Sequence, residues 1–181
     1  MAAKRHVVLL RGVNLGKNKR IAMSDFRALL ESLGYEDVRT HIVSGNAIVS
    51  GGQGPATGME RAIEQALDSK LGLDVTVIVR SAKELDDLVS ANPFATKRAD
   101  PKAMHAVFLS MDPKPAAVEA VDPAGSAPDR FAFGKRVIYL HLTDGVAGSK
   151  LPNWEKLLEV RTTMRTWNVV NRLRDMAAGE A

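Results

Sequence analysis

The sequence predicts an α+β protein made of two similar strand-helix halves. Short runs of apolar and β-branched residues alternate with amphipathic helical segments, and the order of these segments in the first half recurs in the second. Hydrophobic residues make up 45% of the 181 positions and charged residues 25%, as in ordinary globular proteins. A chain of this length can bury one large core or two small ones.

The first half opens with a strand, a basic loop and a helix. Residues 6–10 are mostly apolar and β-branched, which predicts the strand, and residues 11–20 form a glycine-containing loop rich in Lys and Arg. Ser24 has the position of a helix N-cap. Apolar residues then recur at helical spacing until Gly34, which predicts a left-handed C-terminal cap.

A hairpin, two further helices and a strand complete the first half. Residues 38–43 and 46–50 predict two strands joined across a Ser-Gly turn. Capping-box patterns at 57–60 and 81–84 predict the starts of two helices, with a strand at 75–79 between them. The resulting order of strand, helix, strand, strand, helix, strand is a split βαβ, or ferredoxin-like, arrangement.

The second half follows the same order with one element missing. The sequence predicts a strand, a short helix, a hairpin, a short helix opened by Pro152 and a final helix, at residues 103–110, 112–121, 130–142, 152–158 and 163–176. No strand closes this copy, so the second ferredoxin-like half is expected to be incomplete or modified and to end in a C-terminal helix. Both sheets should be mostly antiparallel.

The domain organisation follows from a polar segment between the halves. We predict an N-terminal half over residues 1–92, a connection over 93–102 and a C-terminal half over 103–181. The second half includes the C-terminal helix. A monomer is the expectation, although the sequence leaves the oligomeric state open.

Composition excludes several classes of site. The chain has no cysteine, which rules out disulfides, thiolate nucleophiles and cysteine-ligated metals. No apolar stretch near the N-terminus is long enough for a signal peptide or a membrane span, so a cytoplasmic protein without a membrane partner is expected. Residues 1–40 hold eight basic against four acidic residues, and residues 161–181 hold four against two. These basic ends would attract anions if the fold joined them, or would simply aid solubility.

Chain topology brings two distant loops to one edge of the first sheet. The first and second strands of a split βαβ sheet run parallel, so the loops after them, at 11–14 and 44–46, are neighbours. Their two glycines, two amides, hydroxyl and single cation suit an anionic or polar ligand. Alternatively, Asn14 and Asn46 only stabilise turns. The candidate ligand-binding residues here are Arg11, Gly12, Asn14, Lys17, Ser44, Gly45 and Asn46.

Two other segments invite comparison with known site types. The loop 12–18 has three residues between its glycines and Asn after Lys17, so it is not a nucleotide-hydrolysing P-loop, although its N–H groups could bind an anion. Near the C-terminus, Thr163, Arg165 and Asn168 are candidate ligand residues at the start of a helix. Their alternative role is structural, with a threonine as a plain N-cap.

Histidine spacing predicts no metal site. The four histidines lie in or at the ends of strand segments and show no clustered ligand spacing: His6, His41, His105 and His141. No nucleophile elbow for acyl transfer is present either. We therefore expect neither a metal nor a cofactor, and no catalytic residue is assigned.

A set of short motifs is spread over nearly the whole chain, at residues 10–16, Met23, Leu29, 38–40, 44–46, 92–94, Tyr139, 149–151 and 163–168. Together these motifs resemble those of a bacterial family known as domain of unknown function 1697. The chain departs from the family pattern at 41–43, at Thr166 and after Gly16. The resemblance implies two ferredoxin-like subdomains and implies no activity.

Three functions remain open from the sequence. The first is a binding module for a phosphate-bearing ligand, either a nucleotide or a nucleic acid, at the basic edge rich in Gly and Asn. The second is an enzyme that acts on a small phosphorylated or carboxylated metabolite, with Arg11 and Arg165 as clamps and Lys17 or His41 as acid or base. The third is a structural or partner-binding protein without a ligand.

Overall fold

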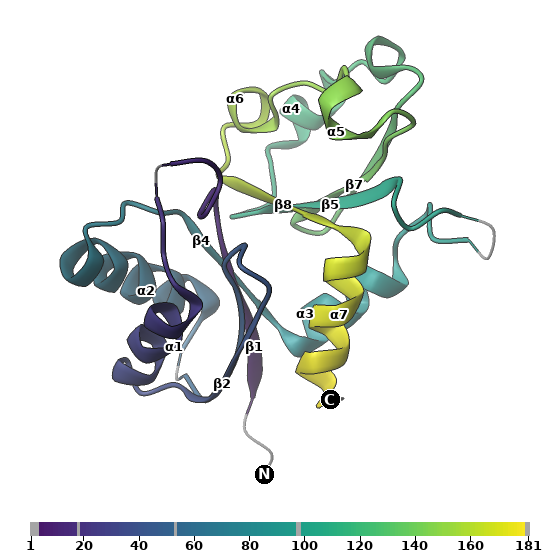
Figure 1. Ribbon diagram of the computed structural model, residues 1–181. Coiled ribbons are helices and arrows are strands. Elements are labelled where there is room, and N and C mark those ends of the chain that lie inside the picture. The colour runs from purple at the N-terminus through teal and green to yellow at the C-terminus, as the bar shows by residue number, and fades with distance from the viewer. Residues whose placement is uncertain (1–3, 18, 53, 97–98, 180–181) are drawn as a thin grey trace. The chain divides into compact units, whose positions relative to one another are not determined.

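The chain folds into two compact units. Unit 1 comprises Met1–Asp86 and Arg172–Ala181, and unit 2 comprises Asp87–Asn171. The computed structural model describes residues 4–17, 19–52, 54–96 and 99–179 (Figure 1). Asn18 of the basic loop and residues 97–98 of the predicted connection lie outside the described residues.

Unit 1 contains a four-stranded antiparallel sheet in the order β2-β3-β1-β4. Its elements are β1 (Arg5–Leu10), α1 (Met23–Ser32), β2 (Glu36–His41), β3 (Asn46–Ser50), α2 (Ala56–Leu71), β4 (Val77–Ser81) and the start of α3 (Ala82–Ser90). Helices α1 and α2 lie on the same face of the sheet (Figure 1). Val8 and Leu10 of β1 join the core beneath these helices because alternate residues of a strand share one face.

Two glutamates of α2 bind the edge strand of unit 1. Glu60 Oε1 accepts a hydrogen bond from the Val79 N–H, and Glu64 Oε1 accepts one from the Val77 N–H, both at 2.9 Å. Strand β4 is at the end of the sheet, where main-chain groups lack a strand partner on one side. The predicted capping box at Thr57 and Glu60 is therefore wrong: α2 begins at Ala56 after Pro55, and Glu60 turns inward to the sheet.

Unit 2 repeats the four-strand order, with strands β6-β7-β5-β8. Its elements are β5 (Met104–Leu109), α4 (Pro115–Glu119), the 3-10 helix η1 (Ala124–Ser126), β6 (Arg130–Gly134), β7 (Val137–His141), α5 (Gly145–Gly148), α6 (Trp154–Leu158), β8 (Thr162–Thr166) and the start of α7 (Trp167–Ala178). Trp154 and Leu158 of α6 belong to the same hydrophobic core as Val107 and Leu109 of β5. The predicted α+β fold of two ferredoxin-like halves is confirmed.

The closing strand of unit 2 corrects the sequence prediction. We expected helix from residue 163 and no fourth strand, but Thr162–Thr166 forms β8 and pairs antiparallel with β5. Along β8, Thr163 and Arg165 are buried while Met164 is 37% exposed. That alternation has the period of a strand, and the β-branched threonines favour it. The prediction of a helix here was wrong because it placed Met164 on the buried apolar face of that helix.

Helix α7 ends against the sheet of unit 1. The Arg39 guanidinium donates to the Met176 carbonyl at 2.8 Å, and the Arg5 guanidinium donates to the Ala177 carbonyl at 3.3 Å. The last carbonyls of a helix lack partners within the helix and carry partial negative charge, so arginines stabilise them. These bonds attach residues from the end of the chain to β1 and β2.

Candidate functional site

The two distant loops of unit 1 meet where β1 ends. Strand β3 pairs antiparallel with both β1 and β2, so β1 and β2 run parallel, as predicted. The Leu10 N–H donates to the Gly45 carbonyl at 2.8 Å, and the Arg11 N–H donates to the Thr76 carbonyl at 2.9 Å. We call this edge the β1 rim and define it as residues 10–17, Lys19, 42–46 and 74–76. Its loops come together as the sequence predicts.

Gly45 permits the close approach of the two loops. Its φ of +74° lies in the left-handed region, which side chains with a Cβ rarely adopt. A Cβ placed on Gly45 would lie 2.6 Å from Val13 Cγ2 and 2.7 Å from Leu10 Cβ. Only glycine fits at this point without a shift of the loop after β1.

The Asn14 amide joins the loop after β1 to Ile21 and to the hairpin turn. Its Nδ2 donates to the Ile21 carbonyl at 2.9 Å and to the Val43 carbonyl at 2.6 Å, and its Oδ1 accepts from the Ile21 N–H at 2.9 Å. The Asn14 backbone is left-handed, with a φ of +57°. These three bonds fix the shape of the loop after β1 and join it to the hairpin.

The Asn46 amide organises the hairpin turn in the same way. Asn46 has no exposed surface, and its Nδ2 donates to the His41 carbonyl at 3.1 Å and to Ser44 Oγ at 3.0 Å. The turn spans residues 42–45, because β2 ends at His41 and β3 begins at Asn46. The sequence had predicted a two-residue turn at 44–45. Both rim amides donate to neighbouring protein groups, so they position the two loops of the rim.

A shallow depression of about 330 Å³ opens on the β1 rim. It is lined by two cations, one carboxylate, a glycine and a hydroxyl, namely Arg11, Lys19, Asp74, Gly12 and Thr76. The Lys19 ammonium donates to the Asp74 main-chain carbonyl. Gly12 has a φ of +64°, and nothing lies within 4 Å of the position that a Cβ would occupy. A ligand can therefore approach the main chain here.

The sequence did not reveal all of the lining residues. Asp74 and Thr76 precede β4, which runs antiparallel to β1 in the register Leu10↔Val77 and so begins beside the end of β1. The sequence predicted this strand at 75–79, which placed residues 75 and 76 inside the strand and not in the loop beside β1.

Lys17 is exposed on the loop after β1, and Arg20 Nε donates to the Gly16 carbonyl at 3.3 Å. His41 ends β2, and desolvation together with Arg172 lowers its pKa.

Exposed aliphatic side chains accompany the cations of the β1 rim. Leu15 is 72% exposed on the loop after β1, and Ile42 and Val43 are 50% and 70% exposed on the hairpin turn. Ile42 has a φ of +47°, an uncommon conformation for a β-branched residue. The bond from Asn14 to Val43 holds the two loops beside each other. The rim therefore presents apolar surface as well as positive charge.

The three C-terminal candidates belong to unit 2 and have different environments. Thr163 and Arg165 lie on β8, so their predicted place at a helix start is wrong, while Asn168 is exposed in the first turn of α7. Arg165 Nη1 donates to Thr163 Oγ1 and to the Met164 carbonyl, both at 2.8 Å. Burial lowers the pKa of Arg165 to about 10.

Arg80 is a buried counterpart of Arg165 that the sequence pattern did not indicate. Val77 pairs with Leu10 in unit 1, and Thr162 pairs with Leu109 in unit 2, so Arg80 and Arg165 occupy equivalent positions on the fourth strands. Each guanidinium donates to the carbonyl of its preceding residue at 2.8 Å. An alignment of the two halves would have shown an arginine at the same position of each fourth strand. That alignment requires residues 162–166 to be recognised as a strand.

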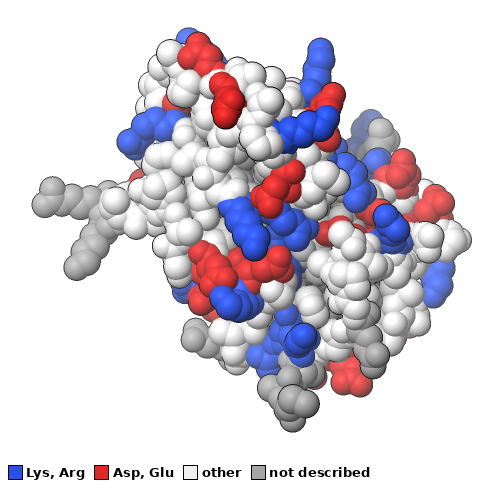
Figure 2. Space-filling view, turned by 180° about the vertical axis from the view of Figure 1, so that it is seen from behind, with Lys and Arg blue, Asp and Glu red and all other residues white. Residues whose placement is uncertain are grey.

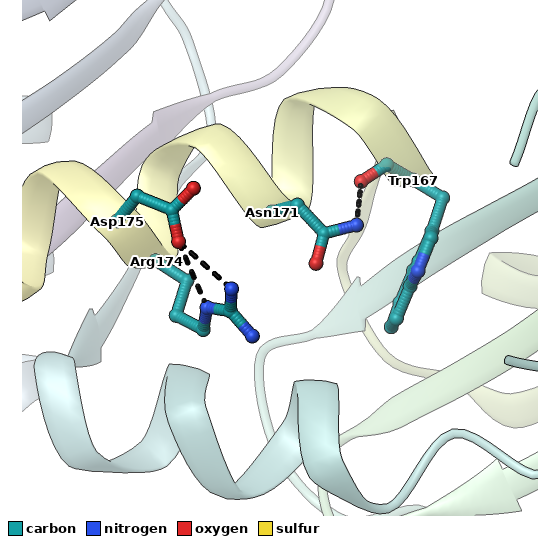
Figure 3. A network of polar contacts seen from close by, with 4 residues as sticks. All are labelled: Trp167, Asn171, Arg174 and Asp175. Atoms are coloured by element: carbon teal, nitrogen blue, oxygen red, sulfur yellow. Dashed lines mark hydrogen bonds and ion pairs between the residues drawn. The ribbon is translucent and has the colours of Figure 1, made fainter.

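Charges elsewhere do not form one basic surface on the face shown in Figure 2, where Lys and Arg are interspersed with Asp and Glu. On α7, the Arg174 guanidinium donates to Asp175 Oδ1 at 2.8 and 3.1 Å (Figure 3). In the same helix, Asn171 Nδ2 donates to the Trp167 carbonyl at 3.0 Å. Arg174 is thus paired with its neighbour on the same helix.

Equivalent histidines lie near the start of each first strand, His6 in β1 and His105 in β5. Both are buried, and the Nδ1 atom of each has no hydrogen-bond partner in the described part of the chain. Desolvation is the largest cause that lowers both pKa values, opposed by hydrogen bonds to the main chain of Gly51 and Ala103. Within the described ranges, no group of three or more His, Asp or Glu could hold a metal ion.

Acidification is expected to destabilise the fold through these imidazoles. The unfolded chain takes up protons near pH 6.5, whereas the folded chain keeps both rings neutral to lower pH. The free energy of unfolding should therefore fall as the pH drops from 7 to 5.5. Urea unfolding at several pH values checks this, and His6→Gln should flatten the dependence. Stability that rises on acidification, or an unchanged slope in the variant, would contradict it.

The fold and the rim define a two-unit, ferredoxin-like α+β protein with a candidate binding edge on its first unit. The chain belongs to the family described as "Protein of unknown function (DUF1697)", whose model matches residues 3–139. The resemblance noted in the sequence is thereby confirmed.

Two other comparisons bear on the fold and on curated relatives. The conserved bacterial protein SP0830 from Streptococcus pneumoniae is similar in structure, with a TM-score of 0.76 and 20% sequence identity. The match covers 97% of this chain and 99% of that one, and it shows a shared fold alone. The comparison with curated proteins found no match. No helix in the described ranges has the length and apolar character needed to cross a membrane.

Proposed function

We propose that this protein is a binding module for a phosphate-bearing ligand, a nucleotide or a nucleic acid, held at the β1 rim. The observation that carries the proposal is the depression in which Arg11 and Lys19 flank the open main chain at Gly12. Guanidinium and ammonium groups bind phosphate through charge-assisted hydrogen bonds. Asp74 offsets one of the two charges, which leaves a net positive lining.

The rim also suits a ligand larger than inorganic phosphate. Leu15, Ile42 and Val43 expose aliphatic surface beside the cations, and such surface can contact a sugar or base. Asn14 and Asn46 keep the loops in place before the ligand arrives, which lowers the entropic cost of binding. In this proposal Arg11 and Lys19 contact the phosphate, Lys17 contributes long-range attraction, and the two amides are positioning residues.

Replacing Arg11 with glutamine is expected to weaken ligand binding by about tenfold or more, because a charge-assisted hydrogen bond is lost. Isothermal titration calorimetry with ATP, and with an oligothymidylate of about ten nucleotides, measures the effect. Arg61→Gln, on the exposed face of α2, removes the same charge away from the rim and serves as the control.

Each outcome of this titration is informative. If neither probe binds, or if Arg11→Gln and Arg61→Gln bind both probes equally, the proposal is wrong. If both probes bind through Arg11, salt separates the two ligand classes. Affinity for a nucleic acid falls steeply with salt because bound counterions are released from its phosphates, whereas affinity for a single nucleotide falls less.

A further inference from the structure

A second cavity, of about 360 Å³, lies in unit 2 and shares no residue with the β1 rim. It is lined by three apolar and three polar residues, namely Pro93, Phe94, Ala99, Thr96, Arg130 and His141. Arg130 and His141 are direct cross-strand partners in the antiparallel pair β6 and β7. Such partners have neighbouring side chains, so the sheet fixes one wall of the cavity.

The other lining residues come from a turn that Asn92 organises and from the segment after it. Asn92 is buried, and its Oδ1 accepts a hydrogen bond from the Phe94 N–H at 2.9 Å. The Thr96 N–H donates to the Phe94 carbonyl, also at 2.9 Å. These bonds hold Phe94 toward the sheet, with its ring centroid 6.1 Å from that of His141 and the two rings tilted by 59°.

The Arg130 guanidinium is held over the Phe94 ring. Its Cζ lies 5.3 Å from the ring centroid, and among the described residues no hydrogen bond or ion pair involves this guanidinium. The neighbouring carboxylates form hydrogen bonds with main-chain groups: Asp129 Oδ1 accepts one from the Thr143 N–H, and Asp100 Oδ1 accepts one from the Lys102 N–H. A guanidinium that stacks its flat face on an aromatic ring still has its N–H donors available, because they lie in the plane of the group. These donors can bind an anion.

We propose that this cavity binds a small molecule that carries one carboxylate and an apolar portion. The planar fork of Arg130 matches the two oxygens of a carboxylate, and a single cation balances its single charge better than that of a phosphate dianion. Thr96 and His141 supply further hydrogen-bonding groups, while Pro93, Phe94 and Ala99 contact the apolar portion. The site is independent of the function proposed for the β1 rim.

Benzoate is the test ligand for this cavity. Benzamide, which has a similar shape but no charge, is the control ligand. Two-dimensional NMR titrations should show saturable benzoate shifts at Phe94, Arg130 and His141, with benzamide at least about tenfold weaker because it lacks the charge. Arg130→Gln should weaken benzoate binding by about tenfold or more. It should change the urea midpoint only slightly, since Arg130 is exposed and its contact with the Phe94 ring is weak. Lys135→Gln, in the β6–β7 turn, should leave benzoate affinity unchanged.

The remaining outcomes overturn the proposal. They are equal binding of benzoate and benzamide, equal affinities of Arg130→Gln and Lys135→Gln, and the absence of any saturable shift. Binding of inorganic phosphate, but not benzoate, through Arg130 would also overturn the assignment to a carboxylate. Because Arg11→Gln leaves this cavity intact, benzoate binding to that variant separates failure of this proposal from failure of the rim proposal.

Discussion

Replacing Gly45 with alanine is expected to lower the free energy of unfolding by about 2–5 kcal/mol. The left-handed backbone costs a residue with a Cβ about 1–2 kcal/mol. The new methyl group would also lie 2.6 Å from Val13 and 2.7 Å from Leu10, and overpacking of this kind costs about 1–3 kcal/mol. The Leu10 contact is with its Cβ, which moves only with the main chain of β1. Urea unfolding measures the loss.

Gly16→Ala is the matched control for this substitution. Gly16 lies on the same rim with a φ of +73°, but no atom lies within 4 Å of its added Cβ. Only the conformational cost of about 1–2 kcal/mol applies there. Equal losses in the two variants would show that the loops do not approach each other closely at Gly45, contrary to the geometry described above.

Replacing Asn14 with alanine is expected to cost about 2–4 kcal/mol of stability. The variant loses three hydrogen bonds, each with a net worth of about 0.5–1.5 kcal/mol, although water can reach part of this loop and replace some of them. Alanine is also strained at a φ of +57°. Chemical denaturation gives the stability, and ATP titration of the same variant reports whether the β1 rim keeps its shape.

Asn14→Gly separates the hydrogen bonds from the backbone strain. Glycine adopts the left-handed conformation readily, so this variant loses the bonds alone, together with a small entropic term. We expect it to be more stable than Asn14→Ala and less stable than the unchanged protein. A wild-type stability for Asn14→Gly would mean that the amide does not clamp the rim.

Local signals in the sequence predicted the elements whose ends are set by short-range bonds. Gly34 and Gly72 end α1 and α2 in left-handed conformations, and Ser81 and Glu84 form the predicted reciprocal cap before α3. The same pattern misled at Glu60, because a buried main-chain donor on β4 competes for that carboxylate. Ser24 likewise fails as a cap, since α1 begins after Ala22.

Two features depend on the pairing of strands distant in the sequence and could not be predicted from local patterns: the strand β8 and part of the lining of the depression. Five residues from Thr162 become a strand because β5 offers them a partner on its open side, and nothing within the segment itself distinguishes strand from helix strongly. For the site, parallel strands and glycines were enough to bring residues 11–14 and 44–46 together. Lys19, Asp74 and Thr76 required the register of β4, which periodicity alone does not fix.

The proposed binding of a phosphate-bearing ligand at the β1 rim is tested most directly by mapping main-chain amide signals during an ATP titration of the unchanged protein. We expect the largest shifts at Gly12, Val13, Lys19 and Thr76, with a common saturation curve. Large shifts confined to unit 2, or the same pattern in Arg11→Gln as in the unchanged protein, would contradict binding at the β1 rim.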